Sequence, residues 1–501
     1  MTLVDEMGKI PGMHGWQRPL DAAHGLWPWA LAQGRPERGE AESKDDEVGA
    51  TGPARGDPRW ISLGMVLIAC WWQIARLGDV RIHLKIFYGW FAMAFGGYLA
   101  MLWMIRHTER ANRSPMAAFL MICVVAVLAR LLMLPTTPTV SDDLYRYRWD
   151  GRVQQAGIDP YAYPPNDPAL AALRDESFSH INFPHLRTVY PPLAQLMFRV
   201  GIALGPTLTA QKIVGVGAEL LLMAALVAVL RARGRSPLWL AAYAWHPLPI
   251  LEVAGSGHND VLAIAMLWIG LAAWSSRQWL GVTVGWALSF LAKFGSLVLV
   301  PWWSWHGARR WLLVFGLFTI GVVALRPTMV SAVIDSMSAM QQHRAESNSS
   351  LYSLLLIVSG SATLARVVCY GLLGAIMVWA AARELDPAQY LLIVFGAGAL
   401  LSPVLHPWYL LWLIPCFCLW QVPSLVALSG TVVLSYTVWP GYLAHQPWVV
   451  PLWARLLEYA PVICLMPLTA SRRWMWRSSR PLAVPPSAGL QKEGTYSDVG
   501  R

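Results

Sequence analysis

Apolar runs long enough to cross a lipid bilayer recur along this chain from about residue 60 to residue 470. A run of about 18 apolar residues is typical of a membrane-spanning helix, because a helix satisfies its own backbone polar groups inside lipid. The composition agrees, since 56% of the residues are hydrophobic and only 14% are charged, against about 25% charged in ordinary soluble domains. The sequence therefore predicts an all-α integral membrane protein and argues against a soluble multidomain one.

The apolar runs predict a polytopic bundle of about 11–13 transmembrane helices. The expected spans cover residues 60–76, 86–105, 116–134, 211–230, 237–254, 260–275, 280–303, 311–328, 363–382, 389–405, 408–420, 424–440 and 454–469. The run 280–303 is expected to be broken, because Lys293 lies near its middle and a lone charge in lipid is costly.

The formal net charge of +10 does not indicate a nucleic-acid partner, because the arginines fall in short clusters between apolar runs. Such clusters are typical of cytoplasmic loops. They contain Arg106, Arg110, Arg113, Arg231, Arg233, Arg235, Arg309, Arg310, Arg472, Arg473 and Arg477. If these clusters lie in the cytoplasm, the chain crosses a plasma (inner) membrane in an orientation that places three regions outside the cytoplasm. These regions are residues 135–210, residues 329–360 and the joint around His406. Three cations, Arg76, Arg81 and Lys85, disagree with this orientation, since the same scheme places their loop outside.

The two ends of the chain are polar, and the transmembrane domain is expected between them, over residues 60–470. Residues 1–59 have no apolar segment near their start and predict a disordered cytoplasmic tail, and residues 471–501 predict a second one. The longest polar stretch between spans is the loop 135–210, whose aromatic and proline content indicates an ordered, functional loop. Its piece 193–206 is amphipathic and too short to span comfortably, so we expect it to lie at the membrane surface or to re-enter.

The first candidate site is the acidic segment 141–152, which follows the third expected span directly. We expect Ser141 to be the N-cap of a short helix, with acidic residues in its first turn. Such a helix places Asp143, Tyr147 and Asp150 on one face. Asp143 and Asp150 are then about 10 Å apart along the axis, which is too far for one shared proton or one metal ion.

The same segment has a purely structural interpretation. In a capped surface helix, Asp142 and Arg146, and Arg146 and Asp150, form ion pairs at a spacing of four residues. The spacing alone favours this interpretation. The position of these acids at the membrane surface, directly after a span, favours a functional one.

The second candidate is the turn Ser256-Gly257-His258-Asn259-Asp260, which lies between two apolar runs. Its polar side chains suit a sugar or a phosphate, on the same side of the membrane as the acidic loop. The alternative is that the turn caps the helix that begins near Asp260.

The third candidate is the segment 402–409, in which Pro403 and Pro407 interrupt an apolar region and His406 lies at the break. Irregular backbone at membrane depth is tolerated where it lines a cavity. The alternative is an interfacial anchor made of Trp408 and Tyr409 beside a proline kink.

Lys293 is the fourth candidate, because an ionisable residue inside the membrane indicates a functional site. The alternatives are a structural ion pair with Glu219 or Glu252, or a side chain that reaches the membrane surface.

Other reaction chemistries find no support in the sequence. No phosphate-binding loop, dinucleotide-binding fingerprint, zinc-protease motif or nucleophile elbow occurs in a suitable context, so a nucleotide-sugar donor and ATP are both unsupported. The six cysteines lie in apolar runs without metal-site spacing, and we interpret them as small hydrophobic residues. We therefore expect no cofactor and no metal ion.

Five motifs occur in a characteristic order: DLYRY (143–147), GIDPY (157–161), YPPL (190–193), GHND (257–260) and SPVLHPWYLLW (402–412). In this order they resemble the GT-C superfamily of polyprenyl-phosphate-sugar-dependent glycosyltransferases, and within it the bacterial α-1,6-mannosyltransferases that build lipomannan backbones. The resemblance covers about residues 117–420. It implies a helical transferase whose active site faces the extracytoplasmic side, with mannosyl-phosphopolyprenol as the donor and a glycan or glycolipid as the acceptor.

The resemblance also implies roles for individual residues. Asp143 keeps the Asp-x-Tyr-x-Tyr spacing and is the preferred general base for an inverting transfer, with its neighbour Asp142 as the alternative. The residues expected to bind the donor or the acceptor are Arg146, Arg152, Tyr190, His258, Asn259, Asp260, Lys293, His406, Trp408 and Tyr409. Among these, the cations Arg146, Arg152, His258 and Lys293 are candidates to stabilise the leaving phosphate.

Two other functions fit a chain of this kind. A carrier or flippase for a lipid-linked sugar would also contain broken helices, but the acidic loop has no convincing repeat elsewhere in the sequence. A non-catalytic partner in envelope assembly would not need the acidic, GHND and HPWY motifs on one face. An enzyme requires that Asp143, His258, Lys293 and His406 converge on one cavity.

Overall fold

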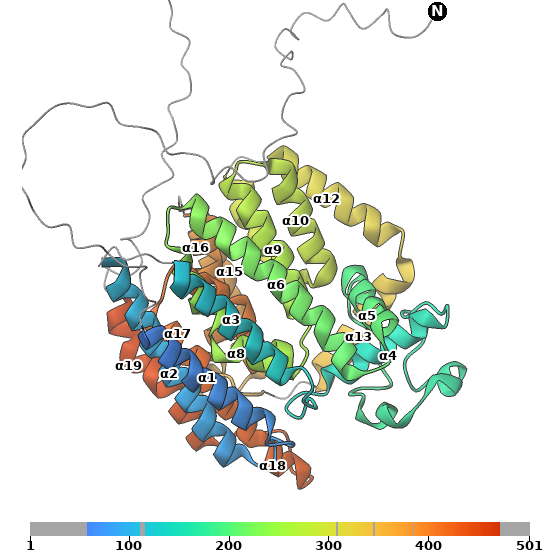
Figure 1. The fold of residues 1–501 in the computed structure, drawn as a ribbon. Coiled ribbons are helices and arrows are strands. Elements are labelled where there is room, and N and C mark those ends of the chain that lie inside the picture. The colour runs from blue at the N-terminus through green and yellow to red at the C-terminus, as the bar shows by residue number, and fades with distance from the viewer. Residues whose placement is uncertain (1–57, 111–115, 307–308, 344–345, 384, 471–501) are drawn as a thin grey trace, which may run out of the picture. The chain divides into compact units, whose positions relative to one another are not determined.

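The computed structural model of the chain describes residues 58–110, 116–306, 309–343, 346–383 and 385–470. The tails predicted at 1–59 and 471–501 therefore lie outside the described residues, except for residues 58 and 59. Within the described ranges every regular element is a helix, and the only β-type pairing is an isolated parallel bridge between Ser347 and Val404 (Figure 1). The prediction of an all-α protein is confirmed.

Three long helices precede the loop, and the first packs against the other two: α1 (Pro58–Ala75), α2 (Leu84–Arg110) and α3 (Met116–Met133). The loop contains four helical pieces: α4 (Asp143–Gln155), η1 (Pro168–Leu173), η2 (Glu176–His180) and α5 (Pro192–Leu204). Helix α4 packs against α5 and against the next helix, α6 (Leu208–Ala232). The loop is thus ordered and seated on the helices that follow it.

The central part of the chain alternates short and long helices. The short pieces are η3 (Pro237–Leu240), α7 (Ala241–Ala244), α8 (Pro247–Pro249) and η4 (Ile250–Gly255), the last of which is a π-helix. They are followed by α9 (Asp260–Ser275), α10 (Trp279–Ala292), η5 (Phe294–Leu299), α11 (Val300–Trp305), α12 (Arg309–Ala324) and α13 (Pro327–His343). Between α10 and η5, Lys293 is extended, with φ −166° and ψ 132°, so the break predicted in the run 280–303 is confirmed.

The C-terminal part packs on this centre through two helix groups. The first group comprises α14 (Leu351–Ser359), α15 (Ala362–Ala381), α16 (Pro387–Leu401), η6 (Pro407–Trp412) and η7 (Ile414–Cys418). The second comprises α17 (Pro423–Thr431), η8 (Val432–Thr437), α18 (Val438–Leu443) and α19 (Leu452–Ala470).

Among the described residues, five helices are long and apolar enough to cross a membrane, and six if α12 and α13, bent by 90°, count as one broken span. The five are Leu84–His107, Met116–Met133, Leu208–Ala232, Ala362–Ala381 and Pro423–Leu443. The chain is therefore a polytopic membrane protein, but fewer helices reach full spanning length than the 11–13 expected. Prolines explain part of the difference, because the runs 237–254 and 408–420 fold as short, proline-initiated pieces instead of single helices.

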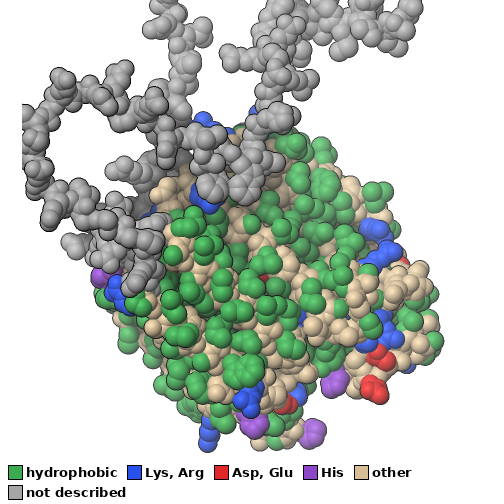
Figure 2. All heavy atoms as spheres, viewed as in Figure 1, with side chains coloured by type: hydrophobic (Ala, Val, Ile, Leu, Met, Phe, Trp, Pro, Cys, Tyr) green, Lys and Arg blue, Asp and Glu red, His purple; other side chains and the backbone are tan. Residues whose placement is uncertain are grey.

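Helix α3 shows how the outer surface suits lipid. Its residues Leu120, Val124, Val127 and Leu131 follow one another at helical spacing and are 42–56% exposed. Figure 2 shows hydrophobic side chains spread over this face of the molecule, while charged side chains lie mostly around its edge, including the part near α4 and the loop. An exposed apolar stripe of this kind is expected where a helix contacts lipid chains.

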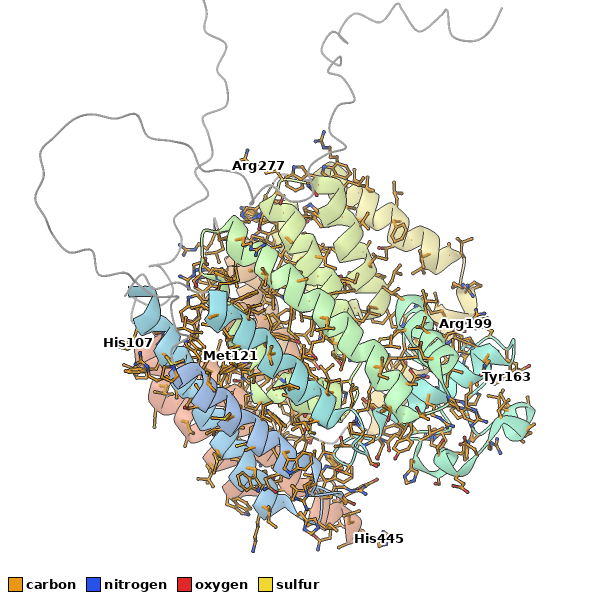
Figure 3. The ribbon with its side chains drawn as sticks, viewed as in Figure 1. His107, Met121, Tyr163, Arg199, Arg277 and His445 are labelled. Atoms are coloured by element: carbon orange, nitrogen blue, oxygen red, sulfur yellow. The ribbon has the colours of Figure 1, made fainter. Side chains whose placement is uncertain are left out.

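The two ends of the helix bundle differ in the residues that they carry. Figure 3 shows His107 and Arg277 at one end. Tyr163, in the long loop, and His445 lie toward the opposite end. The long loop and the turn after α18 are therefore far from the ends of α2 and α9.

Candidate active site

A glycine brings the start of α4 against the turn that precedes α9. Gly257 has φ +81°, in the left-handed region that favours glycine. A Cβ atom at this position would lie 2.7 Å from Cδ1 of Leu144, the second residue of α4. The missing side chain allows this close approach, and it places His258 beside Asp143, which begins α4.

His258 lies between two carboxylates. Its Nδ1 is 3.6 Å from Oδ2 of Asp143, and its Nε2 is 3.2 Å from Oε2 of Glu252. The side chains of His258 and Glu252 are fully buried, whereas that of Asp143 is 32% exposed. Asp143 is therefore the member of this group that a substrate hydroxyl can reach.

Tyr147 and Asn259 lie next to Asp143 and contact each other. The Tyr147 hydroxyl donates to Oδ1 of Asn259 at 3.1 Å and lies 3.4 Å from Oδ2 of Asp143. The Tyr147 ring stacks on Phe198 at 4.6 Å, and Tyr190 packs edge-on against it at 5.1 Å. Tyr190, a predicted binding residue, thus lies behind Tyr147 and supports it.

The N-cap of α4 differs from the prediction. The cap residue is Asp142 and not Ser141, and the Asp142 side chain makes no capping hydrogen bond. Instead, the Ser141 hydroxyl accepts from the backbone N–H of Asp143 at 3.4 Å. The helix starts one residue later than expected. An N-cap side chain normally accepts from the backbone N–H of the second or third helical residue, whereas the Ser141 hydroxyl accepts from that of the first, Asp143.

The two adjacent acids face different surroundings. The Asp142 carboxylate lies near Arg81 and His180 and is hydrogen-bonded to Asn182, away from His258. Burial raises the pKa of Asp142 above its ordinary value, and the charge of Arg81 opposes this shift only in part. Of the two acids, Asp143 is the one that lies beside the GHND turn.

Lys293 and Asp260 form a second polar group on the far side of the GHND turn. Nζ of Lys293 lies 2.6 Å from Oδ2 of Asp260, and the Trp412 indole N–H donates to Oδ1 of Asp260 at 2.8 Å. The partner of Lys293 is therefore neither Glu219 nor Glu252, the two structural partners considered from the sequence. The extended backbone at Lys293 turns this side chain out of the helix line and toward the start of α9.

Gly295 makes room for Trp412 beside this ion pair. A Cβ atom on Gly295 would lie 2.3–2.8 Å from three ring carbons of Trp412. The broken helix after α10 can therefore lie directly on the indole that binds Asp260.

A cavity of about 380 Å³ opens at this ion pair. Its polar wall consists of Asp260, Lys293 and Tyr409. The rest of its wall is mostly apolar or small and is formed by Phe294, Gly295, Phe395, Gly398, Ala399, Ser402, Leu405 and Trp412. The cavity thus combines a cation at one side with an apolar lining, which suits an amphipathic anion.

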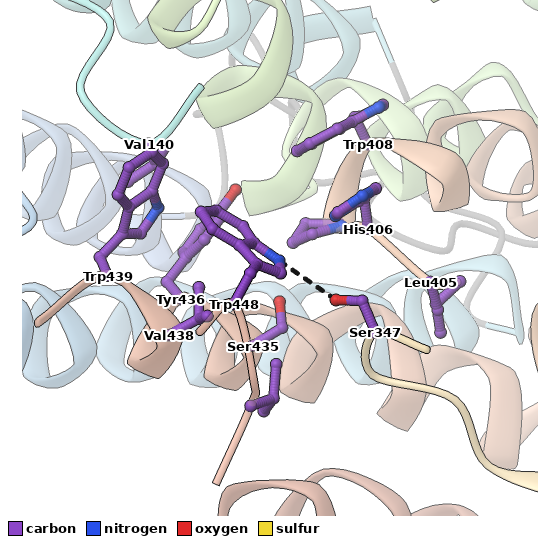
Figure 4. A pocket seen from close by; sticks show the side chains of 12 residues that line it. Val140, Ser347, Leu405, His406, Trp408, Ser435, Tyr436, Val438, Trp439 and Trp448 are labelled. Atoms are coloured by element: carbon purple, nitrogen blue, oxygen red, sulfur yellow. Dashed lines mark hydrogen bonds between the residues drawn. The ribbon is translucent and has the colours of Figure 1, made fainter. Parts of the chain in front are cut away.

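The HPWY segment joins the two polar groups. The ring of His258 stacks on Trp408 with centroids 4.3 Å apart, and His406 stacks on the same indole at 4.4 Å. Tyr409 packs edge-on against His406 at 5.4 Å. A smaller pocket lies next to His406 and Trp408, where the Trp448 indole N–H donates to the Ser347 hydroxyl at 3.2 Å (Figure 4).

Two predicted cations lie outside this arrangement. Nε of Arg146 binds Oδ1 of Asp150 at 2.9 Å, which confirms the predicted pair at that spacing, and Nη2 donates to the backbone carbonyl of Leu186. Arg152 pairs with Asp175 in the loop. Both arginines hold the loop to α4, and the structure does not place either beside Lys293.

A known protein family matches the first part of the chain. Residues 61–309 match the family described as alpha-(1->6)-mannopyranosyltransferase, N-terminal domain. The matched stretch contains Asp143, His258 and Lys293. The chain belongs to this mannosyltransferase family. It is therefore a membrane-embedded glycosyltransferase, and mannosyl transfer is its activity. No curated protein sequence matches the chain.

In this mannosyltransferase, only part of the predicted site forms one connected group. Asp143 contacts His258, which is linked to His406 through the ring of Trp408, and Lys293 follows on the other side of Asp260. Contrary to our expectation, these residues do not all line one cavity: Asp260, Lys293 and Tyr409 line the larger cavity, His406 and Trp408 line the smaller pocket, and Asp143 and His258 line neither of the two.

Sequence analysis did not assign a role to three residues of the candidate site. Glu252 touches His258, Tyr436 donates to Glu252, and Trp412 binds Asp260. Glu252 carried a usable signal, since it is a lone charge in an apolar run. Trp412 is the last residue of the SPVLHPWYLLW motif, whereas Tyr436 carried no signal, because tyrosine is common in membrane helices.

Proposed function

We propose that this mannosyltransferase moves mannose from a polyprenyl-phosphate carrier to a hydroxyl of an extracytoplasmic glycan or glycolipid, with inversion at the anomeric carbon. The observation that carries this proposal is a half-buried carboxylate, Asp143, beside a buried histidine, together with a cavity near the same turn that has the cation Lys293 in its polar wall. The pairing of a base with a cationic, apolar-lined cavity fits a sugar donor whose leaving group is a lipid phosphate.

In the proposed reaction, Asp143 acts as the general base. The acceptor oxygen attacks the anomeric carbon of mannose, its proton passes to the Asp143 carboxylate, and the bond from that carbon to the phosphate oxygen breaks. The electron pair of this bond leaves with the polyprenyl phosphate. A single displacement inverts the anomeric carbon and needs no second carboxylate as a nucleophile. Asp260 suits that nucleophilic role poorly, since it is bound to both Lys293 and Trp412.

Lys293 is the residue proposed to bind the donor phosphate. Its side chain is 32% exposed and lines the cavity, so its ammonium group can bind an anion while it keeps Asp260 as its partner. The aromatic and aliphatic walls, including Phe294, Phe395 and Leu405, suit the first isoprene units of the carrier. Tyr409, at the polar side of the same cavity, is proposed to contact the sugar or the phosphate.

The distribution of arginines supports an extracytoplasmic site. Arg106 donates to Gln421 at 3.4 Å and Arg233 pairs with Asp386 at 2.9 Å, so two of the predicted cytoplasmic clusters are anchored to the C-terminal part of the chain. Arg106 adjoins His107, whose end of the bundle is opposite the loop that contains Tyr163 (Figure 3). By the positive-inside rule, the end with Arg106 is cytoplasmic and the loop faces outward, across a plasma (inner) membrane.

The experiment that tests the proposal measures mannose transfer by the purified protein in liposomes that contain a membrane glycolipid extract. Radiolabelled mannosyl-phosphopolyprenol and a nucleotide-linked mannose are supplied in parallel. We expect label in the glycolipid fraction only with the lipid-linked donor. Transfer only from the nucleotide-linked donor contradicts the proposed carrier. Movement of the labelled lipid between leaflets without transfer indicates a flippase instead.

A further inference from the structure

Glu252 is a carboxylate in the interior of the protein that the proposed reaction does not use. Its side chain is fully buried, and it lies in the π-helix η4. A π-helical turn is rare and occurs frequently at functional sites. Burying a carboxylate is costly unless other groups bind it, so the groups that contact Glu252 indicate its role.

The two oxygens of Glu252 have different partners. Oε1 accepts a hydrogen bond from the hydroxyl of Tyr436, on η8, and Oε2 lies 3.2 Å from Nε2 of His258. The other ring nitrogen of His258 faces Asp143 at 3.6 Å. A continuous chain of polar groups therefore runs from η8 through η4 and the GHND turn to the start of α4.

His258 has a carboxylate beside each of its ring nitrogens, Asp143 at Nδ1 and Glu252 at Nε2. Asp260, the other acid near His258, already binds Lys293. The Tyr147 hydroxyl and the charge of Lys293 also act on Asp143. The charge of Glu252 therefore acts on the ring from the side opposite Asp143 and favours the ring position in which Nδ1 is directed at Asp143.

We infer that Glu252 is a positioning residue for mannosyl transfer, which acts through His258 to hold Asp143 in its orientation. The inference rests on the proposed role of Asp143 as the base. Trp408 already fixes the plane of the His258 ring by stacking. An uncharged residue of similar volume would stabilise the fold as well as a buried carboxylate does. What only the carboxylate supplies is a negative charge 3.2 Å from Nε2 of His258.

Two variants test the inference from the two ends of Glu252. Glu252→Gln keeps the shape of the side chain and loses its charge. Tyr436→Phe removes only the hydroxyl that donates to Oε1 of Glu252. With each protein normalised to its folded fraction, we expect kcat to fall about 10–100-fold in Glu252→Gln, as for other residues that orient a functional group. We expect a smaller decrease in Tyr436→Phe. The KM for the lipid-linked donor should change by less than about twofold in both, since Glu252 does not line the cavity.

Tyr243→Phe is the matched control. Tyr243 is also buried and donates to a buried carboxylate, Glu219, at 3.0 Å, but that carboxylate pairs with Arg130 and not with His258. We expect this variant to lose stability like Tyr436→Phe and to keep the wild-type kcat. Equal kcat values for the two tyrosine variants would overturn the inference, and this comparison stands even if Glu252→Gln does not fold.

The link through His258 has its own test. In a His258→Gln background, the additional change Glu252→Gln should not lower kcat further, because the group that it acts through is absent. A further tenfold loss would overturn the inference. Asp143→Asn separates the two proposals: wild-type kcat in that variant overturns both, whereas an inactive Asp143→Asn with a fully active Glu252→Gln overturns only the role of Glu252.

Discussion

Nζ of Lys293 lies 2.6 Å from Oδ2 of Asp260, and this ion pair forms part of the wall of the 380 Å³ cavity. The Asp260 side chain is 1% exposed, so its charge depends on the lysine and on Trp412 for stabilisation. Lys293 is thus proposed to serve both the fold and the donor phosphate.

Lys293→Met is expected to lower the free energy of unfolding by about 3–5 kcal/mol, because it leaves a buried charge without its partner. Lys293→Arg keeps a cation and should retain most of the stability. Thermal unfolding in detergent and the KM for the lipid-linked donor measure the two effects. Unchanged stability and donor KM in Lys293→Met would contradict both roles of this lysine.

Gly257→Ala should separate His258 from Asp143. An alanine at φ +81° is strained by about 1–3 kcal/mol, and its Cβ would overlap Leu144. We expect a lower melting temperature together with a loss of transfer. The control is Gly374→Ala in α15, where a Cβ meets no atom within 4 Å and the backbone is helical. If both variants behave alike, the close approach at Gly257 is not important.

Asn348 is expected to hold the HPWY segment in place. It is buried, has φ 53°, and donates from Nδ2 to the carbonyl of Leu405 at 3.2 Å and to Glu458 at 3.0 Å. Asn348→Ala loses both bonds and places alanine in a left-handed conformation, so we expect a cost of about 2–4 kcal/mol. The measurement is the melting temperature against Asn166→Ala, a change at an exposed asparagine of the loop. Equal melting temperatures would contradict this role.

The loop should loosen in acid. Burial raises the pKa of the Asp175 carboxyl, but hydrogen bonds from Arg148 and Ser177 outweigh it. Together with the charge of Arg152, they lower this pKa to about 2.

Because an unfolded aspartate has a pKa of about 3.9, the ionised carboxylate stabilises the loop at neutral pH. This stabilisation is lost as the pH falls from about 4 to about 2. Pepsin, which acts in this range, should cleave within residues 166–182 increasingly fast as the pH is lowered. Asp175→Asn should be cleaved readily at every pH tested, and an acid dependence identical to that of the wild type would contradict the assignment.

The parts of the site that the sequence predicts depend on local chemistry. A charge in the middle of an apolar run is costly in any fold, so Lys293 indicated a helix break before its surroundings were known. The order of the GHND and HPWY motifs likewise indicated that His258 and His406 serve one site.

The remaining features depend on which helices approach one another. The sequence suggested Glu219 or Glu252 as the partner of Lys293, and only the packing of η5 against α9 shows that the partner is Asp260. Asp142 and Asp143 are neighbours, and the close contact at Gly257 determines which of them faces His258. Among the described residues, fewer helices reach full spanning length than the apolar runs indicate, because hydropathy does not show where prolines divide a run into short helices.

The central claim is that Asp143 is the base, and the most direct measurement compares Asp143→Asn with Asp142→Asn in the liposome transfer assay. Both changes remove one charge from adjacent residues at the start of α4. The account predicts that Asp143→Asn lowers kcat by about 10²–10⁴-fold, the range typical of a general base, with a melting temperature close to that of the wild type. It predicts that Asp142→Asn keeps at least about a tenth of the activity. Wild-type transfer by Asp143→Asn, or a loss confined to Asp142→Asn, would contradict it.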